Sequence, residues 1–244
     1  MTTEHIVKAY DEELRTLHNF IVRMGGMVES QIAGAIQALV RRDSELAQTL
    51  IKDDDKIDDL NFDVDSFATR MLALRQPVAE DLRNVVGALK ISSDLERMAD
   101  YATNVAKRAV ALAAMPPVKP LYTIPRMSRL VQEMLRDVLD AYVRGDVDTA
   151  IDVWHRDAEV DDMYNSLFRE LLTYMMEDPR SITPCTQLLF VAKNIERIGD
   201  HATNISETIH FLVLGERLRD SRPRGDSSPF AVAPDKDAGG IDLG

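Results

Sequence analysis

One short segment of the sequence occurs twice. Residues 94–104 read Asp-Leu-Glu-Arg-Met-Ala-Asp-Tyr-Ala-Thr-Asn, and residues 194–204 read Asn-Ile-Glu-Arg-Ile-Gly-Asp-His-Ala-Thr-Asn. The offset is a constant 100 residues, and Glu, Arg, Asp, Ala, Thr and Asn return at the same relative positions. An internal repeat restricts the fold to architectures that contain one structural unit twice. Copies that served only packing would share apolar positions, whereas these also share the polar pattern Glu-x-x-x-Asp.

Hydrophobic residues recur at helical spacing through almost the whole chain, and no alternating strand pattern persists. Asp43 is the expected N-cap of the second helix, and Gln76-Pro77 is expected to end it, because a residue before proline avoids the helical region. Gly25-Gly26, inside the first helix, predicts a kink or the close approach of another backbone. The sequence therefore predicts an all-α fold with six helices, over about residues 14–39, 43–74, 79–114, 127–145, 146–177 and 184–219.

A second alignment relates the two halves of the chain. Residues 38–60 match residues 141–163 without a gap at an offset of 103. The segment at residues 115–120 lies between the halves and is too rich in proline to be helical. We therefore predict two tandem three-helix bundles followed by a tail whose Pro, Gly, Ser and Asp content predicts disorder. These three regions span residues 1–119, 120–219 and 220–244.

The composition narrows the classes of partner. The net charge of −12 argues against nucleic acid, because phosphate backbones attract clustered Lys and Arg, and it favours cations or a basic protein surface. Cys185 is the only cysteine, so neither an intrachain disulfide nor a thiolate zinc site is expected. The first residues show no signal-peptide pattern and no apolar run is long enough to span a bilayer, so we expect a cytoplasmic protein.

The repeated acidic residues are candidates for a binding site. At about 100° per residue, they fall roughly 160° from the apolar seam of their helix, so we expect them to point outward. A row of carboxylates suits a hard or borderline cation such as Mg, Mn or Fe. One helix supplies too few ligands, so acidic residues of the second and fifth helices are the expected additional donors. The motif carboxylates are Glu96, Asp100, Glu196 and Asp200, and the available additional donors are Asp53, Asp54, Asp55, Asp58, Asp59, Asp157, Asp161 and Asp162.

A simpler interpretation than a metal site is that these carboxylates only face solvent. An acidic row on a helix is usually a solvated face, and duplication alone would copy it.

The sequence does not favour an enzyme. A ferritin-like di-metal enzyme would need Glu-x-x-His, but His201 lies five residues after Glu196. The sequence also lacks a Gly-rich phosphate loop, a His-Glu-x-x-His motif and a nucleophile elbow. We therefore expect a regulator or scaffold rather than an enzyme.

These features resemble the PhoU family of bacterial regulators of phosphate uptake, over about residues 5–219. The resemblance implies a cytoplasmic homodimer that represses phosphate uptake and the phosphate-starvation regulon when phosphate is plentiful. It also implies two partners, a sensor histidine kinase and the ATP-binding subunit of the high-affinity phosphate transporter, and contact with the membrane only through them. The segments that carry the resemblance are Gln76–Arg83, Leu95–Asp100 and Ile195–Asp200.

The resemblance further implies a divalent metal or an iron cluster on the two motif surfaces. The second copy has Gly199 and His201 where the first has Ala99 and Tyr101, so the two sites are expected to differ in nuclearity or affinity. Three functions stay open: a signalling adaptor for a basic partner surface, a metal store or metal-dependent enzyme, and an assembly spacer. The implied metal ligands are Glu96, Asp100, Glu196 and Asp200, with Asp58 and Asp161 as further candidates.

Overall fold

The computed structural model describes residues 2–118 and 122–218, and the tail predicted at 220–244 lies outside them. Within the described ranges the fold is all-α, as the hydrophobic periodicity predicted. No helix in these ranges is both long and apolar enough to cross a lipid bilayer. The helices are α1 (Thr2–Arg41), α2 (Ser44–Asp53), α3 (Asp55–Arg75), α4 (Glu80–Ala113), α5 (Thr123–Arg144), α6 (Val147–Glu177), the 3₁₀ helix η1 (Pro179–Ser181) and α7 (Ile182–Leu214).

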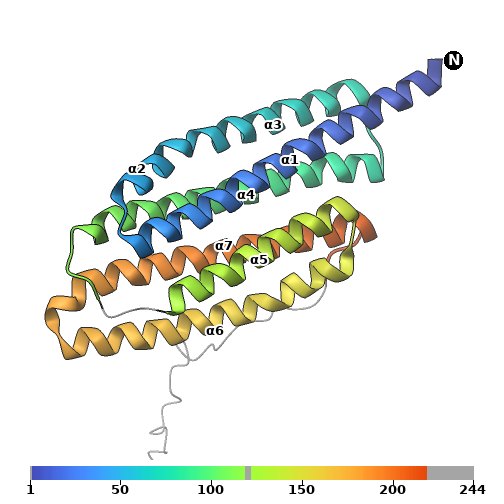
Figure 1. Cartoon of the computed structure of the whole chain (residues 1–244). Helices are drawn as coiled ribbons and strands as arrows, with labels where there is room; N and C mark the ends of the chain where they lie inside the picture. The colour runs from blue at the N-terminus through green and yellow to red at the C-terminus, as the bar shows by residue number, and fades with distance from the viewer. Residues whose placement is uncertain (1, 119–121, 219–244) are drawn as a thin grey trace, which may run out of the picture.

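The helices form two stacked three-helix bundles, as the repeat predicted (Figure 1). In the first bundle α1, α4 and the α2–α3 pair pack together, and in the second α5, α6 and α7 do so. The bundles meet where α4 packs along α7 and α1 packs against α5. Because of these contacts, the buried hydrophobic residues of both repeats form one continuous core.

The apolar seams predicted for the repeated helices lie in this core. Leu95 and Met98 of α4, and Ile195 and Ile198 of α7, are at most 1% exposed. Burial of one such side chain contributes about 1.5–3 kcal/mol. Leu74, the last residue of the predicted second helix, is an exception to the burial of hydrophobic residues, because it is 68% exposed in the last turn of α3.

Two glycines allow helices of different bundles to approach closely. A β-carbon on Gly25 of α1 would lie 2.4 Å from Cδ1 of Leu139 on α5, and one on Gly87 of α4 would lie 2.4 Å from Cδ2 of Leu212 on α7. Both distances are far below van der Waals contact, so glycine provides the space that each leucine fills. The predicted approach of another backbone at Gly25-Gly26 is wrong, because the neighbour of Gly25 is the side chain of Leu139 and no atom lies within 4 Å of a β-carbon on Gly26. α1 continues through both glycines.

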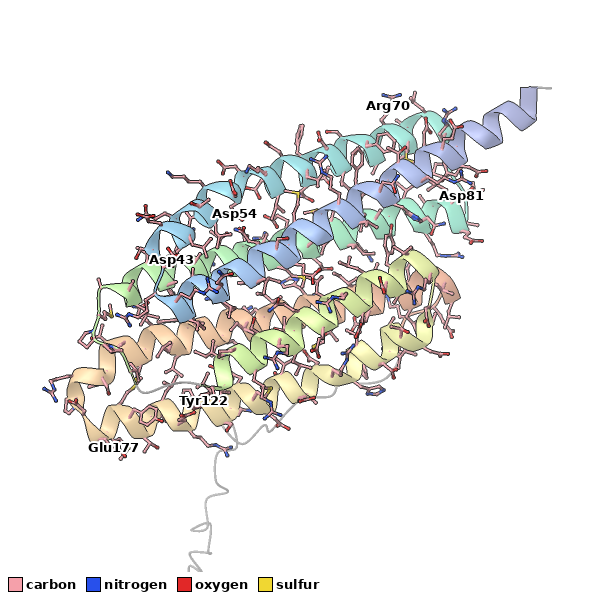
Figure 2. The ribbon with its side chains drawn as sticks, viewed as in Figure 1. Asp43, Asp54, Arg70, Asp81, Tyr122 and Glu177 are labelled. Atoms are coloured by element: carbon pink, nitrogen blue, oxygen red, sulfur yellow. The ribbon has the colours of Figure 1, made fainter. Side chains whose placement is uncertain are left out.

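The ends of the helices follow local sequence signals. Asp43 caps α2 by accepting hydrogen bonds at Oδ1 from the backbone N–H groups of Glu45 (3.1 Å) and Leu46 (3.0 Å), as predicted. Figure 2 places Asp43 at the turn between α1 and α2. The sixth predicted helix ends earlier than expected, at Leu214, because Gly215 adopts the left-handed conformation (φ 75°) that terminates helices.

The predicted second helix is divided at Asp54, where α2 gives way to α3 (Figure 2). Gln31 of α1 is 4% exposed, and its Nε2 donates to the Leu50 carbonyl oxygen (2.8 Å) and to Thr103 Oγ1 (2.8 Å). The Leu50 carbonyl is the acceptor that a continuous helix offers to the N–H of Asp54. Gln31 therefore competes for this acceptor, and the helix restarts one residue later. At the offset of 103, the second repeat has the buried, apolar Met134, and α6 is continuous.

Candidate functional site: two acidic clusters

The repeated carboxylates form two clusters, each between two helices of one bundle. The first acidic cluster lies between the α2–α3 junction and α4, and the second lies between α6 and α7. All six sequence-predicted ligands belong to these clusters, three to each. The first acidic cluster consists of Asp54, Asp58, Glu96 and Asp100, and the second of Asp157, Asp161, Glu196 and Asp200.

The motif glutamates are more covered than the helical wheel predicted. The side chain of Glu96 is 23% exposed and that of Glu196 only 12%, whereas that of Asp100 is 40% exposed. The prediction that every motif carboxylate points outward is therefore wrong for the glutamates. The reason is that the α2–α3 segment packs beside Glu96 on α4 and α6 packs beside Glu196 on α7, so a neighbouring helix of the same bundle partly covers each glutamate.

Burial and mutual repulsion act on the carboxyl groups of the first acidic cluster. Burial raises the pKa of Glu96, and the negative charge of Asp100 raises it further. Burial is also the main cause of the raised pKa of Asp54 and of Asp58. Repulsion between like charges disfavours the ionised forms, so this cluster favours the approach of a cation.

An arginine lies at the rim of the first acidic cluster. Nη1 of Arg97 is 3.3 Å from Oδ2 of Asp100, and its Nε is 3.5 Å from Oε2 of Glu96. The Arg97 side chain is 58% exposed, so solvent screens both contacts and they stabilise the fold little.

A lysine contacts the second acidic cluster instead. Nζ of Lys193 donates to Oε1 of Glu196 at 2.7 Å. Burial raises the pKa of Glu196, and the hydrogen bond from Lys193 partly opposes this effect. Arg197, the repeat equivalent of the rim arginine, lies over the ring of Tyr101, 5.9 Å from its centroid. Lys193 does not belong to the repeated pattern, because position 93 of the first repeat is a serine.

A threonine one turn beyond each motif links the motif helix to its neighbour. The single hydroxyl proton of Thr203 has two acceptors within reach, Oδ1 of Asp157 (3.2 Å) and the carbonyl oxygen of Gly199 (2.9 Å). A hydrogen bond with Thr103 likewise lowers the pKa of Asp54, although burial outweighs it. The recurrence of Thr in the repeat was the sequence signal for this contact.

Each acidic cluster contains a buried carboxylate oxygen without a hydrogen-bond partner among the described residues. These atoms are Oδ1 of Asp54 and Oε2 of Glu196. A buried, unsatisfied oxygen of this kind costs free energy, which a bound cation would offset. Carboxylates and hydroxyls are the donors that Mg, Mn and Fe ions accept, so the residues of both clusters fit such an ion in chemistry and charge.

The clusters as they stand are not closed metal sites. Across residues 2–118 and 122–218, no three His, Cys, Asp or Glu side chains are gathered closely enough to hold a metal ion. Ion binding would therefore require side chains of both helices in a cluster to rotate.

The histidine of the second motif takes part in a contact between the bundles. Nδ1 of His201 lies 2.7 Å from Oδ1 of Asp94, and Nδ2 of Asn204 donates to the same oxygen at 3.3 Å. The rings of Tyr101 and His201, which occupy equivalent positions in the two motifs, lie 5.6 Å apart. His201 thus connects α7 to α4.

A family model agrees with this twofold arrangement. The model described as "PhoU domain" matches the chain twice, at residues 21–109 and 124–209. Each match covers one bundle and one acidic cluster.

Curated relatives and solved structures are similar to nearly the whole described chain. Two relatives are named "Phosphate-specific transport system accessory protein PhoU homolog". The one from Caulobacter vibrioides (strain NA1000 / CB15N) is 56% identical over 92% of this chain and 98% of the relative. The one from Rhizobium meliloti (strain 1021) is 47% identical over 93% of this chain and 96% of the relative. The crystal structure of PhoU from Pseudomonas aeruginosa has a TM-score of 0.81 at 40% identity, over 85% of this chain and all of that one. The crystal structure of the phosphate transport system regulatory protein PhoU from Streptococcus pneumoniae also has a TM-score of 0.81, at 30% identity, over 86% and 99%.

Proposed function

The chain belongs to the PhoU family, and on that premise we propose that it is an accessory protein of phosphate transport that represses phosphate uptake and the phosphate-starvation regulon. The names of its relatives support the accessory role. The observation that carries the proposal is the pair of equivalent acidic clusters, which present carboxylates at matching positions of two bundles. Neither cluster pairs a nucleophile with a base, so binding rather than catalysis is the function that they support.

We propose that the protein is a cytoplasmic adaptor between the high-affinity phosphate transporter and a sensor histidine kinase. In this proposal basic surfaces on the ATP-binding subunit of the transporter and on the kinase dock on the acidic clusters. The net charge of −12 and the exposed carboxylates of Asp58 and Asp100 support partners of this charge. Contact with the membrane is through these partners only. The homodimer stays a prediction, which sedimentation velocity of the purified chain tests.

Deletion of the gene tests the regulatory role. We expect phosphate-starvation genes to become active in phosphate-rich medium, and the wild-type gene to restore repression. A variant that combines Asp58→Asn with Asp100→Asn should fold but restore repression only weakly, because it removes two exposed charges of the first acidic cluster. Asp65→Asn with Asp152→Asn is the matched control, since both aspartates are exposed and outside the clusters. Normal regulation in the deletion strain would exclude the role.

We also propose, as a second function, that the acidic clusters bind metal ions. Glu96, Asp100 and Asp58 would hold an ion at the first cluster, and Glu196, Asp200 and Asp161 would hold one at the second. The ion would supply positive charge that offsets the repulsion between the carboxylates. The two buried oxygens without partners support this proposal.

Elemental analysis of the purified chain tests the metal proposal. The matched variant combines Glu96→Gln with Glu196→Gln, which keeps the size of both side chains and removes their charge. We expect metal in the wild type and less in the variant. Absence of metal from both, after dialysis against Mg, Mn and Fe salts, would exclude a metal store or metal-dependent enzyme and leave the adaptor.

A further inference from the structure

A cavity lies where the two bundles meet, in the groove between α4 and α7 and outside both acidic clusters. Its volume is about 570 Å³, within the range of about 300–1,000 Å³ that is typical of sites for small molecules. Since α4 belongs to the first bundle and α7 to the second, a ligand in this cavity contacts both halves of the chain. Its lining includes Lys90 and Asp94 of α4, Asn204, Glu207 and Phe211 of α7, and Arg217 of the segment after α7.

The segment after α7 completes the wall of the cavity. Gly215, in the left-handed conformation (φ 75°), ends α7, and the carbonyl oxygen of Glu216 lies 3.1 Å from Nδ1 of His210. His210 is only 8% exposed, so this contact holds the segment against a buried group of α7. Arg217 and Leu218 follow directly and line the cavity.

The carboxylates of the cavity already have hydrogen-bond partners within the fold. Oδ1 of Asp94 accepts from Nδ2 of Asn204 (3.3 Å) and lies 2.7 Å from Nδ1 of His201. Oε1 of Glu207 accepts from the indole Nε1 of Trp154 at 3.1 Å. Both acidic groups are therefore held by the protein and do not neutralise the cations beside them.

The cations of the cavity have no such partners. Lys90 and Arg217 form no ion pair with any carboxylate among residues 2–118 and 122–218. In a chain with a net charge of −12, two unpaired cations in one cavity favour an anionic ligand. Their combined charge matches one phosphomonoester, which carries about −1.5 to −2 at pH 7. The hydroxyls of Ser93 and Thr208, also in the lining, can donate to phosphate oxygens.

An aromatic ring lies beside one of these cations. Nζ of Lys90 is 5.7 Å from the centroid of the Phe211 ring, and Phe211 is half-buried in the wall of the cavity. Nucleobases stack on exposed faces of aromatic side chains. The second carboxylate oxygens of Asp94 and Glu207 can accept hydrogen bonds from sugar hydroxyls. The cavity thus combines groups for a phosphate, a sugar and a planar base.

We propose that this cavity binds a nucleoside monophosphate. Lys90 and Arg217 hold the phosphate, and Phe211 stacks on the base. Glu207 accepts a hydrogen bond from the ribose. The site is separate from the acidic clusters and independent of the regulatory and metal-binding functions proposed above.

Isothermal titration calorimetry of the full-length chain with AMP, GMP, CMP and UMP tests the site. EDTA is present, so that metal ions cannot bridge a phosphate to the acidic clusters. We expect at least one of the four to bind once per chain. The corresponding nucleoside, ribose 5-phosphate and inorganic phosphate should each bind about tenfold more weakly or worse, because each lacks the phosphate, the base or both base and sugar.

Trp154 provides a second, independent readout. It is the only tryptophan of the chain, and its indole N–H donates to Glu207 in the wall of the cavity. A ligand that draws on the Glu207 carboxylate changes the surroundings of the indole. We therefore expect the fluorescence of Trp154 to change with the same midpoint as the calorimetric titration.

Substitutions assign the binding to the cavity. Lys90→Gln and Arg217→Gln should each weaken binding of the nucleotide about tenfold, because a hydrogen bond between charged groups is lost. Phe211→Leu should weaken the nucleotide about tenfold and leave ribose 5-phosphate unchanged. Lys52→Gln and Arg129→Gln are the matched controls, since they remove the same charges from exposed positions outside the cavity; neither should change the affinity. Circular dichroism confirms that each variant is folded.

Three results would overturn this assignment. The first is the absence of heat and of a fluorescence change with all four nucleotides at millimolar concentration. The second is an unchanged affinity in the variant that combines Lys90→Gln with Arg217→Gln, which would place the nucleotide elsewhere. The third is inorganic phosphate that binds as tightly as the nucleotide, which would exclude recognition of sugar and base. Gene deletion and elemental analysis test the other proposals separately, so their failure is distinguishable from all three.

Discussion

In the first repeat the helix after α1 is divided at Asp54, whereas in the second repeat α6 runs without a break from Val147 to Glu177. Gln31 occupies the buried position facing the break, and Met134 occupies the equivalent position opposite α6. One buried amide that donates to a helix carbonyl thus accompanies the change of path. The same amide donates to Thr103, which contacts Asp54, so the difference in packing extends directly to the first acidic cluster.

A second difference concerns the charges around the clusters. The motif arginine is repeated, but Arg97 contacts its own cluster whereas Arg197 lies over Tyr101 of the other repeat. Lys193 takes the place beside Glu196. Duplication thus preserved the carboxylates while the cations beside them diverged.

The largest expected effect comes from the shared core. Leu95→Ala and Ile195→Ala remove equivalent buried side chains and should each lower the free energy of unfolding by about 2–5 kcal/mol. Trp154, the only tryptophan, lies in the second bundle, so its fluorescence reports on that bundle in a urea titration. Because the core is continuous, Leu95→Ala in the first bundle should also shift the Trp154 transition. An unshifted Trp154 transition would mean that the repeats unfold independently.

The next effect concerns the break at Asp54. Gln31→Ala leaves the Leu50 carbonyl and Thr103 without their donor and should lower the free energy of unfolding by about 1–3 kcal/mol. Gln31→Met copies the second repeat, frees the Leu50 carbonyl and should slow hydrogen exchange of the Asp54 amide by restoring its helical acceptor. Unchanged exchange in Gln31→Met would show that the break has another cause.

A smaller effect, an increase in the free energy of unfolding, is expected from a substitution within the second motif. The first repeat has Ala99 where the second has Gly199, and a β-carbon on Gly199 would lie 3.4 Å from Cγ1 of Val160 and 3.6 Å from Cγ2 of Val131. These distances are close to ordinary contact, and glycine inside a helix costs about 0.5–1 kcal/mol relative to alanine. Gly199→Ala should therefore raise the free energy of unfolding by up to this amount in urea titrations. A free energy of unfolding below that of the wild type would mean that the side chains of Val160 and Val131 cannot move to accommodate the added methyl group.

The smallest expected effect depends on pH. Burial raises the pKa of Glu96 above its ordinary value of 4.5, so the stability linked to its protonated form is present below that value and is lost as pH rises through the raised pKa. Glu96→Gln should stabilise the chain by some tenths of a kcal/mol at neutral pH, and thermal unfolding should show the gain vanish near pH 4. Glu196→Gln should stabilise the chain less at neutral pH, since it removes the carboxylate that is paired with Lys193. An equal gain at both positions would contradict this comparison.

Local sequence signals were sufficient for most of the architecture. The two offsets predicted two bundles, Asp43 and Gln76-Pro77 predicted helix boundaries that the structure confirms, and the repeated carboxylates marked residues that lie in two clusters. Each of these features depends on residues that are close together in the chain or on a constant spacing.

Contacts between segments that are distant in the chain could not be predicted from such local signals. The break at Asp54 depends on Gln31, and the burial of Glu196 depends on the packing of α6 beside α7. From the sequence alone Lys193 has the features of an ordinary surface lysine, and only the fold brings it next to Tyr164 and Glu196. A helical wheel describes one helix alone and does not contain the neighbour that covers its outer face.

The position of the outermost helices has a consequence for stoichiometry. α3 and α6 lie on opposite sides of the stacked bundles (Figure 1), and each contacts only elements of its own half. The two acidic clusters accordingly lie in different halves of the chain, the first beside α3 and the second beside α6. For any protein that recognises them, one molecule therefore offers the same kind of surface twice.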